Sequence, residues 1–128
     1  RMREYLREKE GMVAYAKLSL HEIEKALTIN HVVIDGLYSW EEFLFLHRIF
    51  KERLLILAIY APPPVRYLRL GSRIHRPLHK KEAIERDFSE IENLNIGGPI
   101  IMADHTIINI HGLDDLRVHI SEFVKTHF

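Results

Sequence analysis

One carboxylate and one row of arginines are the side chains of this chain best suited to chemistry. Asp35 follows the apolar residues 31–34 and precedes Gly36. Because β-branched residues favour strands, we predict a strand over residues 31–35 with this carboxylate at its C-terminal end. A carboxylate there can hold Mg²⁺ directly or through water, while glycine lets the backbone turn away. The alternative is an ordinary Asp-Gly turn, since this dipeptide is common in turns.

The arginines are Arg66, Arg69, Arg73 and Arg76, at spacings of three, four and three residues. On a helix, this spacing places all four along one face. Guanidinium groups bind phosphate oxygens through two parallel hydrogen bonds, so the row would suit a clamp that closes over a triphosphate. The alternative is a solvated helix face whose arginines pair with nearby glutamates.

Two further sets of polar residues are less specific. Arg86 and Asp87 are adjacent in a charged helical stretch, where a surface salt bridge explains them as well as a ligand contact does. His75 and His79 are four residues apart, but Pro77 interrupts the helix that would bring them onto one face. We therefore expect no histidine metal site.

Composition indicates a single domain and limits its partners. The 128 residues are 47% hydrophobic and carry 18 basic and 18 acidic side chains, which is enough apolar material for one packed core. Zero net charge gives no overall field that attracts nucleic acid or an anionic membrane. The sequence has no cysteine and no apolar run of bilayer-spanning length. We expect a cytoplasmic protein that binds neither nucleic acid nor membrane.

The apolar pattern alternates between helical and strand-like periods, which is typical of an α/β protein with a mainly parallel sheet. Helical spacing or a capping signal predicts helices over residues 2–10, 12–27, 40–50, 64–73, 81–94 and 113–125. Short apolar runs predict strands over residues 31–35, 53–60 and 105–110, and residues 95–99 are predicted as a turn. Ligands bind at the C-terminal ends of parallel strands, so the loops at 35–39, 61–64 and 110–112 should form the site.

Five segments resemble, in order and spacing, the C-terminal two-thirds of P-loop nucleotide-kinase-like proteins. They are LREKEGMVAYAKLSL, VVIDGLYSWEEF, LAIYAPPPVRYLRLGSR, ERDFSEIE and MADHTIINIHGLDDL. The resemblance is to the dephospho-CoA-kinase-like and adenylate-kinase-like branch, including its archaeal members. It implies a three-layer αβα fold with a mainly parallel sheet, incomplete at its N-terminus. Residues 1–128 would form a single kinase-like domain, with a lid over residues 72–81.

The resemblance also implies roles for individual residues. Asp35 would lie near Mg²⁺ and the acceptor as the metal-side carboxylate, and Arg69 and Arg73 would act with it in catalysis. The other implied ligand-binding residues are Arg7, Gly36, Tyr38, Arg66, Arg76, Arg86, Asp87, Ile110, His111 and Gly112. Tyr38 departs from the pattern, because relatives often carry an arginine there that holds an acceptor phosphate.

The implied activity is transfer of the γ-phosphate of ATP, with Mg²⁺, to a small nucleotide-like or coenzyme-like acceptor. Catalysis would come mainly from positioning and charge neutralisation. A non-catalytic nucleotide-binding or oligomerisation module of the same fold is the main alternative, and an ATPase or GTPase switch is the third.

One part of the implied machinery is missing from the sequence. The 128 residues contain no G-x-x-x-x-G-K-[ST] loop. The resemblance places that loop, together with a central strand, within about 50 residues ahead of this chain. We therefore expect the predicted strands 31–35 and 53–60 to flank a gap. Either further residues of the protein, a partner segment or a second copy completes the sheet, or the strands rearrange.

Overall fold

The computed structural model describes residues 2–128, which form two compact units. Unit 1 contains residues 2–55 together with Glu90–Ile101, and unit 2 contains Ile56–Ser89 and Met102–Phe128. Helix α5 (Lys80–Leu94) begins in unit 2 and ends in unit 1. Among residues 2–128, no helix is both long enough and apolar enough to cross a membrane.

Unit 1 is helical. Besides the end of α5, its elements are α1 (Met2–Glu10), α2 (Ala14–Leu27), α3 (Trp40–Phe50), the 3₁₀ turn η1 (Lys51–Arg53) and α6 (Gly97–Ile101). The predictions for α1 and α3 are confirmed, and α2 begins two residues later than predicted. The turn predicted over residues 95–99 is wrong in part, because α6 begins within it. Pro99 lies in the first turn of α6, where its missing N–H costs no intrahelical bond.

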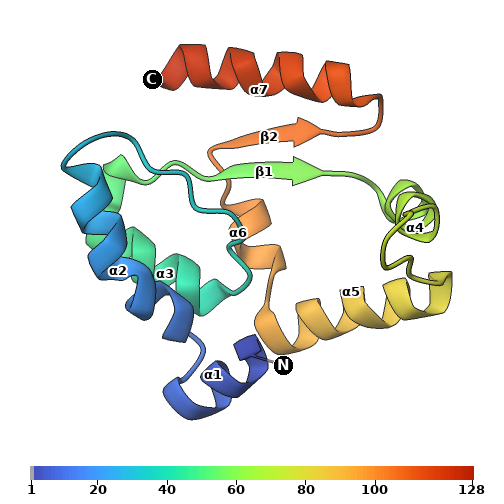
Figure 1. The fold of residues 1–128 in the computed structure, drawn as a ribbon, viewed down its shortest axis with the longest axis horizontal. Helices are drawn as coiled ribbons and strands as arrows, with labels where there is room; N and C mark the ends of the chain where they lie inside the picture. The colour runs from blue at the N-terminus through green and yellow to red at the C-terminus, as the bar shows by residue number, and fades with distance from the viewer. Residues whose placement is uncertain (1) are drawn as a thin grey trace. The chain divides into compact units, whose positions relative to one another are not determined.

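The core of unit 1 lies between α2 and α3, which run side by side (Figure 1). Ala16 and Ile23 on α2 are seven residues apart, and Leu46 and Phe50 on α3 are four apart, so each pair lies on one helical face. Val32 and Leu37, from the segment that joins the two helices, pack against this core. The core therefore fixes both ends of the segment that carries Asp35.

The strand predicted over residues 31–35 is wrong. Residues 31–39 form no helix or strand, and Val33 is 93% exposed. A strand is stabilised by hydrogen bonds to a neighbouring strand, and neither strand in the described part of the chain pairs with these residues. The β-branched composition is that of a strand, but composition alone supplies no partner.

Unit 2 is built on a parallel pair of strands, β1 (Leu57–Tyr60) and β2 (His105–Ile108), whose arrows point the same way in Figure 1. Leu57 pairs with His105 and Tyr60 with Ile108, so the two strands end together. This parallel pair confirms the predicted α/β class. Both strands are shorter than predicted. Arg53 belongs to η1 and residues 54–56 form no strand, while at the other end of the pair only the Asn109 N–H, bonded to the Tyr60 carbonyl at 2.7 Å, extends the ladder past Ile108.

Helices follow both strands. Helix α4 (Pro63–Gly71) starts with two prolines, which suit the first turn, and it ends two residues before the predicted limit. Helix α7 (Leu113–His127) begins after Gly112, as predicted, and packs against β2. The rings of His105 on β2 and Phe123 on α7 stack with their centroids 5.5 Å apart.

The capping signal for residues 40–50, Ser39 followed three residues later by Glu42, is present in part and testable, since the Glu42 carboxylate accepts the N–H of Tyr38 and not that of Ser39. Ser39 is fully buried, and its Oγ accepts the Glu42 N–H at 3.1 Å. We expect Ser39→Ala to lower the free energy of unfolding by about 1 kcal/mol, because it removes this bond from a buried N–H. Ser72→Ala is the matched control, since Ser72 is exposed and bonds only to the end of α4. Chemical denaturation measures both, and equal effects would contradict the assignment.

Candidate functional site

The segment around Asp35 in unit 1 turns sharply at Gly36. Gly36 has φ 93°, a conformation that residues with a side chain rarely adopt. A Cβ at this position would also run into the ring of Tyr38. The predicted role of Gly36 as the turning point is confirmed, and the Asp35 carboxylate next to it is exposed.

Glu42 connects this segment to two helices. Its carboxylate accepts the N–H of Tyr38 at 3.2 Å, and its side chain is only 5% exposed. On the other side, Nη2 of Arg7 lies 3.7 Å from Glu42 Oε1. Arg7 is on α1 and Glu42 on α3, so one buried carboxylate links α1, α3 and the segment that follows Asp35.

The guanidinium of Arg7 is nearly buried, at 12% exposed. Its Nε and Nη2 have no hydrogen-bond partner among the described residues. The distance of 3.7 Å to Glu42 allows an ion pair but is too long for a hydrogen bond. Because Nε and Nη2 form one edge of the guanidinium, Arg7 presents two parallel donors suited to a bidentate oxyanion.

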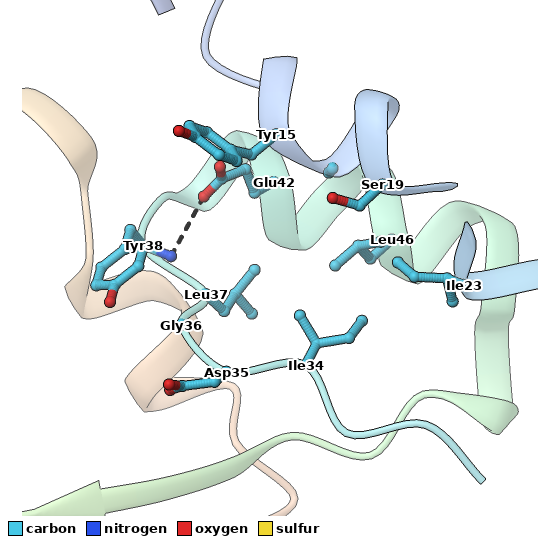
Figure 2. Close-up of a pocket in the computed structure, with 11 residues that line it drawn as sticks. Tyr15, Ser19, Ile23, Ile34, Asp35, Gly36, Leu37, Tyr38, Glu42 and Leu46 are labelled. Carbon is cyan, nitrogen blue, oxygen red and sulfur yellow. Dashed lines mark hydrogen bonds between the residues drawn. The ribbon is translucent and has the colours of Figure 1, made fainter. Parts of the chain in front are cut away.

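A cavity of about 110 Å³ lies between α2, residues 34–38 and α3 (Figure 2). Figure 2 shows Ile34 and Leu37 directed towards Leu46 and Ile23, while the Asp35 carboxylate points away from them. Glu42 and Ser19 contribute the polar atoms on the helix side. The cavity is therefore mainly apolar, and Asp35 is accessible on its outside.

In unit 2, the first arginine of the predicted row is held inside the unit. Arg66 donates from Nη2 to Asp87 Oδ2 at 2.5 Å and from Nη1 to the carbonyl of Ala61 at 2.6 Å. The same carboxylate oxygen accepts the hydroxyl of Tyr67 at 2.8 Å. Arg66 and Asp87, both predicted as ligand-binding, thus join α4 to α5. Neighbouring Arg86 is exposed.

Arg69 is held in the same way, by main-chain oxygens. Its Nη1 donates to the carbonyl of Asn109 at 2.6 Å and its Nη2 to that of His111 at 3.0 Å. Arg69 therefore contacts the loop of Ile110, His111 and Gly112, which was predicted to be part of the site.

The last two arginines of the row differ from the first two. Arg73 and Arg76 are exposed, and neither forms a hydrogen bond or ion pair to the described residues. Arg76 has φ 53°, in the loop between α4 and α5. Since α4 ends at Gly71, the predicted helical face carries Arg66 and Arg69 only, and Arg73 and Arg76 belong to the predicted lid over residues 72–81.

The structure thus groups the predicted site residues within each unit. Unit 1 holds Arg7, Asp35, Gly36 and Tyr38, and unit 2 holds Arg66, Arg69, Arg73, Arg76, Arg86, Asp87, Ile110, His111 and Gly112. Two residues that the sequence analysis did not single out are central, Glu42 and Tyr67. The capping box pointed to Glu42, because its third position often bonds back to the preceding backbone. No sequence signal marked Tyr67.

The residues present fit Mg²⁺ better than a metal that needs a full protein cage. No group of three or more His, Cys, Asp or Glu side chains gathers among the described residues. Mg²⁺ is usually held by one or two carboxylates, with waters and substrate phosphates completing its shell. Asp35 is a single exposed carboxylate and would supply one of those ligands.

Three relatives show which family this chain belongs to. A UPF0200 protein of Pyrococcus furiosus is 34% identical over 127 residues, which cover 96% of this chain and 68% of the relative. The chain belongs to the UPF0200 family. UPF0200 proteins of Thermococcus onnurineus and Thermococcus gammatolerans are 33% and 37% identical, and the matches cover 94% of this chain and 66% and 65% of these relatives. No family model matches the sequence.

The UPF0200 chain therefore spans about two thirds of the length of these three relatives. The matches cover nearly all of it, so they include both the Asp35 segment and the Arg69 loop.

Tyr67 of this UPF0200 chain provides a pH-dependent signal of the contact between α4 and α5. Its hydrogen bond to Asp87, with help from burial, raises the pKa of the phenol above 10.0, while Arg66 acts in the opposite direction. The folded state therefore holds the proton more tightly than the unfolded state. The resulting stabilisation is complete below pH 10.0 and is lost as the pH rises through the folded pKa.

We expect the phenolate absorbance of Tyr67, isolated by subtracting the titration of Tyr67→Phe, to appear above pH 10.0. Asp87→Asn should move this titration towards the ordinary value, because the accepting charge is removed. Circular dichroism checks that the variants fold. A wild-type titration at or below pH 10.0 would refute the contact.

Proposed function

We propose that the protein containing this chain is a kinase-like phosphotransferase. It would transfer the γ-phosphate of ATP to a small nucleotide-like or coenzyme-like acceptor, with Mg²⁺ at Asp35. The resemblance to the dephospho-CoA-kinase-like and adenylate-kinase-like branch supports the reaction class. The proposal requires a phosphate-binding loop that the 128 residues lack, and the relatives have length for one beyond the part matched here.

The observation that supports the proposal most is the unpaired edge of Arg7. Leaving donors of a buried charged group unsatisfied costs stability, so this arrangement favours a ligand that completes it. Glu42 faces this edge electrostatically, since its Oε1 lies 3.7 Å from Nη2, but it accepts no hydrogen bond from it. An acceptor phosphate or carboxylate would fill that edge only after neighbouring side chains move, because both nitrogens are buried in the free chain, and it would then offset the lack of an arginine at Tyr38.

Each group then has a defined role. Mg²⁺, when bound, would neutralise charge on the transferring phosphates, and Asp35 would hold it with water. Arg7 would orient the acceptor through two hydrogen bonds. Arg73, exposed and without a partner among the described residues, would bind phosphate oxygens of the donor. Positioning of this kind supplies most of the catalysis in phosphoryl transfer.

The first test concerns Asp35. In the full protein, incubated with ATP, Mg²⁺, nucleoside monophosphates or dephospho-CoA, we expect phosphoryl transfer to one acceptor. Asp35→Asn should lower turnover at least about tenfold, or roughly 1.4 kcal/mol in the barrier, because it removes the metal-side charge. Asp114→Asn is the matched control, since Asp114 is 98% exposed and bonds only to exposed Arg117.

Three other results of this assay would each favour a different interpretation. ATP binding without transfer to any acceptor would favour the non-catalytic module. Hydrolysis of ATP that needs no acceptor would favour the switch. Unchanged turnover in Asp35→Asn would return Asp35 to an ordinary turn residue.

The second test concerns Arg7. We expect Arg7→Lys to raise the KM for the acceptor at least about tenfold, since a hydrogen bond to a charged group contributes about 1.5–3 kcal/mol and lysine cannot bind bidentately. The KM for ATP should not change. Lys9→Gln on the same helix is the control, because Lys9 is exposed. A rise in the KM for ATP instead would place Arg7 on the donor side.

A further inference from the structure

One side of α4 forms the floor of an open groove in unit 2. Four residues of α4 line it at the i, i+3, i+4 and i+7 positions of one helical face, namely Pro64, Tyr67, Leu68 and Gly71. Ser72, directly after α4, and Lys80, at the start of α5, complete the lining. Figure 1 shows the loop that joins these two helices. All of the lining residues belong to unit 2.

The groove lies on the side of α4 away from Arg66 and Arg69. Residues two positions apart on a helix point in nearly opposite directions. Arg66 follows Pro64 by two positions, and Arg69 precedes Gly71 by two. The two arginines donate to carbonyls at the strand ends, while Leu68 on the groove side is 73% exposed. The groove is therefore separate from the contacts that build unit 2.

The size of the groove favours a polypeptide over a small molecule. Its volume is about 400 Å³, whereas an apolar cavity of roughly 150 Å³ holds a benzene ring, so it has room for more than one side chain. Small-molecule pockets enclose most of their ligand, but this groove is open along Leu68. A groove beside a helix suits the apolar face of a second helix, whose side chains enter at successive turns.

The rim of the groove is basic. Residues 72–81 contain no acidic residue and four cations, Arg73, Arg76, Lys80 and Lys81. Over the whole chain, by contrast, 18 basic and 18 acidic side chains balance. Lys81 lies 3.9 Å from Glu85, and the other three cations form no ion pair with the described residues. A negatively charged partner would complement this rim.

We propose that the groove binds an amphipathic helix of a protein partner, with aliphatic side chains on one face and acidic residues along its flanks. The aliphatic side chains would contact Leu68 and Tyr67, and the acidic ones would pair with Lys80 and its basic neighbours. Other polyanions match only part of this surface. The apolar floor adds nothing to the binding of a nucleic-acid backbone, and a flat lipid surface does not enter a groove. The inference is independent of the proposed function, because it uses neither Asp35 nor Arg7.

Three synthetic helical peptides of equal length test this inference. The first has leucines at i, i+3, i+4 and i+7, flanked by glutamates. The second has lysines in place of the glutamates, and the third has alanines in place of the leucines. Calorimetry with the full protein at low ionic strength measures each affinity. We expect the first peptide to bind at least about tenfold more tightly than the others, because only it matches both the floor and the rim.

Variants locate the binding. Leu68→Ser should weaken binding of the first peptide about tenfold, because it removes apolar surface that the complex buries. Val118→Ser is the matched control, since Val118 is 55% exposed on α7, outside the groove. Lys80→Glu should weaken the first peptide about threefold and strengthen the lysine peptide, whereas Lys125→Glu on α7 should change neither. Circular dichroism checks that the variants fold.

The other outcomes contradict the inference. It is wrong if the first peptide binds no better than the other two, or if Leu68→Ser has no larger effect than Val118→Ser. If Lys80→Glu weakens the glutamate and lysine peptides alike, the partner is not selected by acidic charge. Sedimentation with vesicles of phosphatidylserine and phosphatidylcholine covers the remaining case. Vesicle binding that Leu68→Ser abolishes, without binding of the first peptide, would assign the groove to a membrane surface instead.

Discussion

The carboxylate of Glu42 is the group on which unit 1 depends most. It is almost completely buried, so the free energy of burying its charge must be offset by favourable interactions, namely a hydrogen bond from the Tyr38 N–H and an ion pair with the Arg7 guanidinium. These partners lie on different elements. Satisfying one buried charge therefore fixes where α1 and the Asp35 segment lie relative to α3.

In unit 2, positively charged side chains satisfy main-chain oxygens that would otherwise lack hydrogen-bond donors. The end of a strand leaves carbonyls without ladder partners, and arginines of α4 supply the donors: Arg66 for Ala61, Arg69 for Asn109 and His111. Just before the start of β1, a carboxylate satisfies a main-chain donor: Asp104 accepts the Ile56 N–H at 2.7 Å. Charged side chains thus complete the short sheet at both of its ends.

Local signals in the sequence were enough to predict the parallel class and every described α-helix except α6. Capping at Ser39, prolines at the start of α4 and Gly112 before α7 act over a few residues, and the structure has each. The segment over residues 31–35 was predicted from β-branched composition alone. A strand also needs a neighbour, which the described part of the chain does not provide, and no local pattern reports that.

The candidate site was predicted in its residue types but not in its contacts. Gly36 was identified because a turn after Asp35 restricts the backbone locally, and its φ of 93° agrees. The pairs that decide what the arginines do are distant, since Asp87 lies 21 positions after Arg66 and Asn109 lies 40 positions after Arg69. Helical spacing places Arg66 and Arg69 on one face but cannot say whether that face meets phosphate or protein.

What decides between those two uses is the supply of unpaired acceptors close to the helix. A guanidinium has five donors, and it binds whichever oxygens are in reach with the right geometry. Helix α4 starts soon after β1, close to the ends of both strands. Its first two arginines therefore donate hydrogen bonds to main-chain carbonyls of the chain itself. Arg73 lies beyond the end of that helix, past the last of these carbonyls, and keeps its donors free for an anion from outside. Position relative to the strand ends, and not the spacing of the row, therefore separates the arginines that build unit 2 from those that remain available to a ligand.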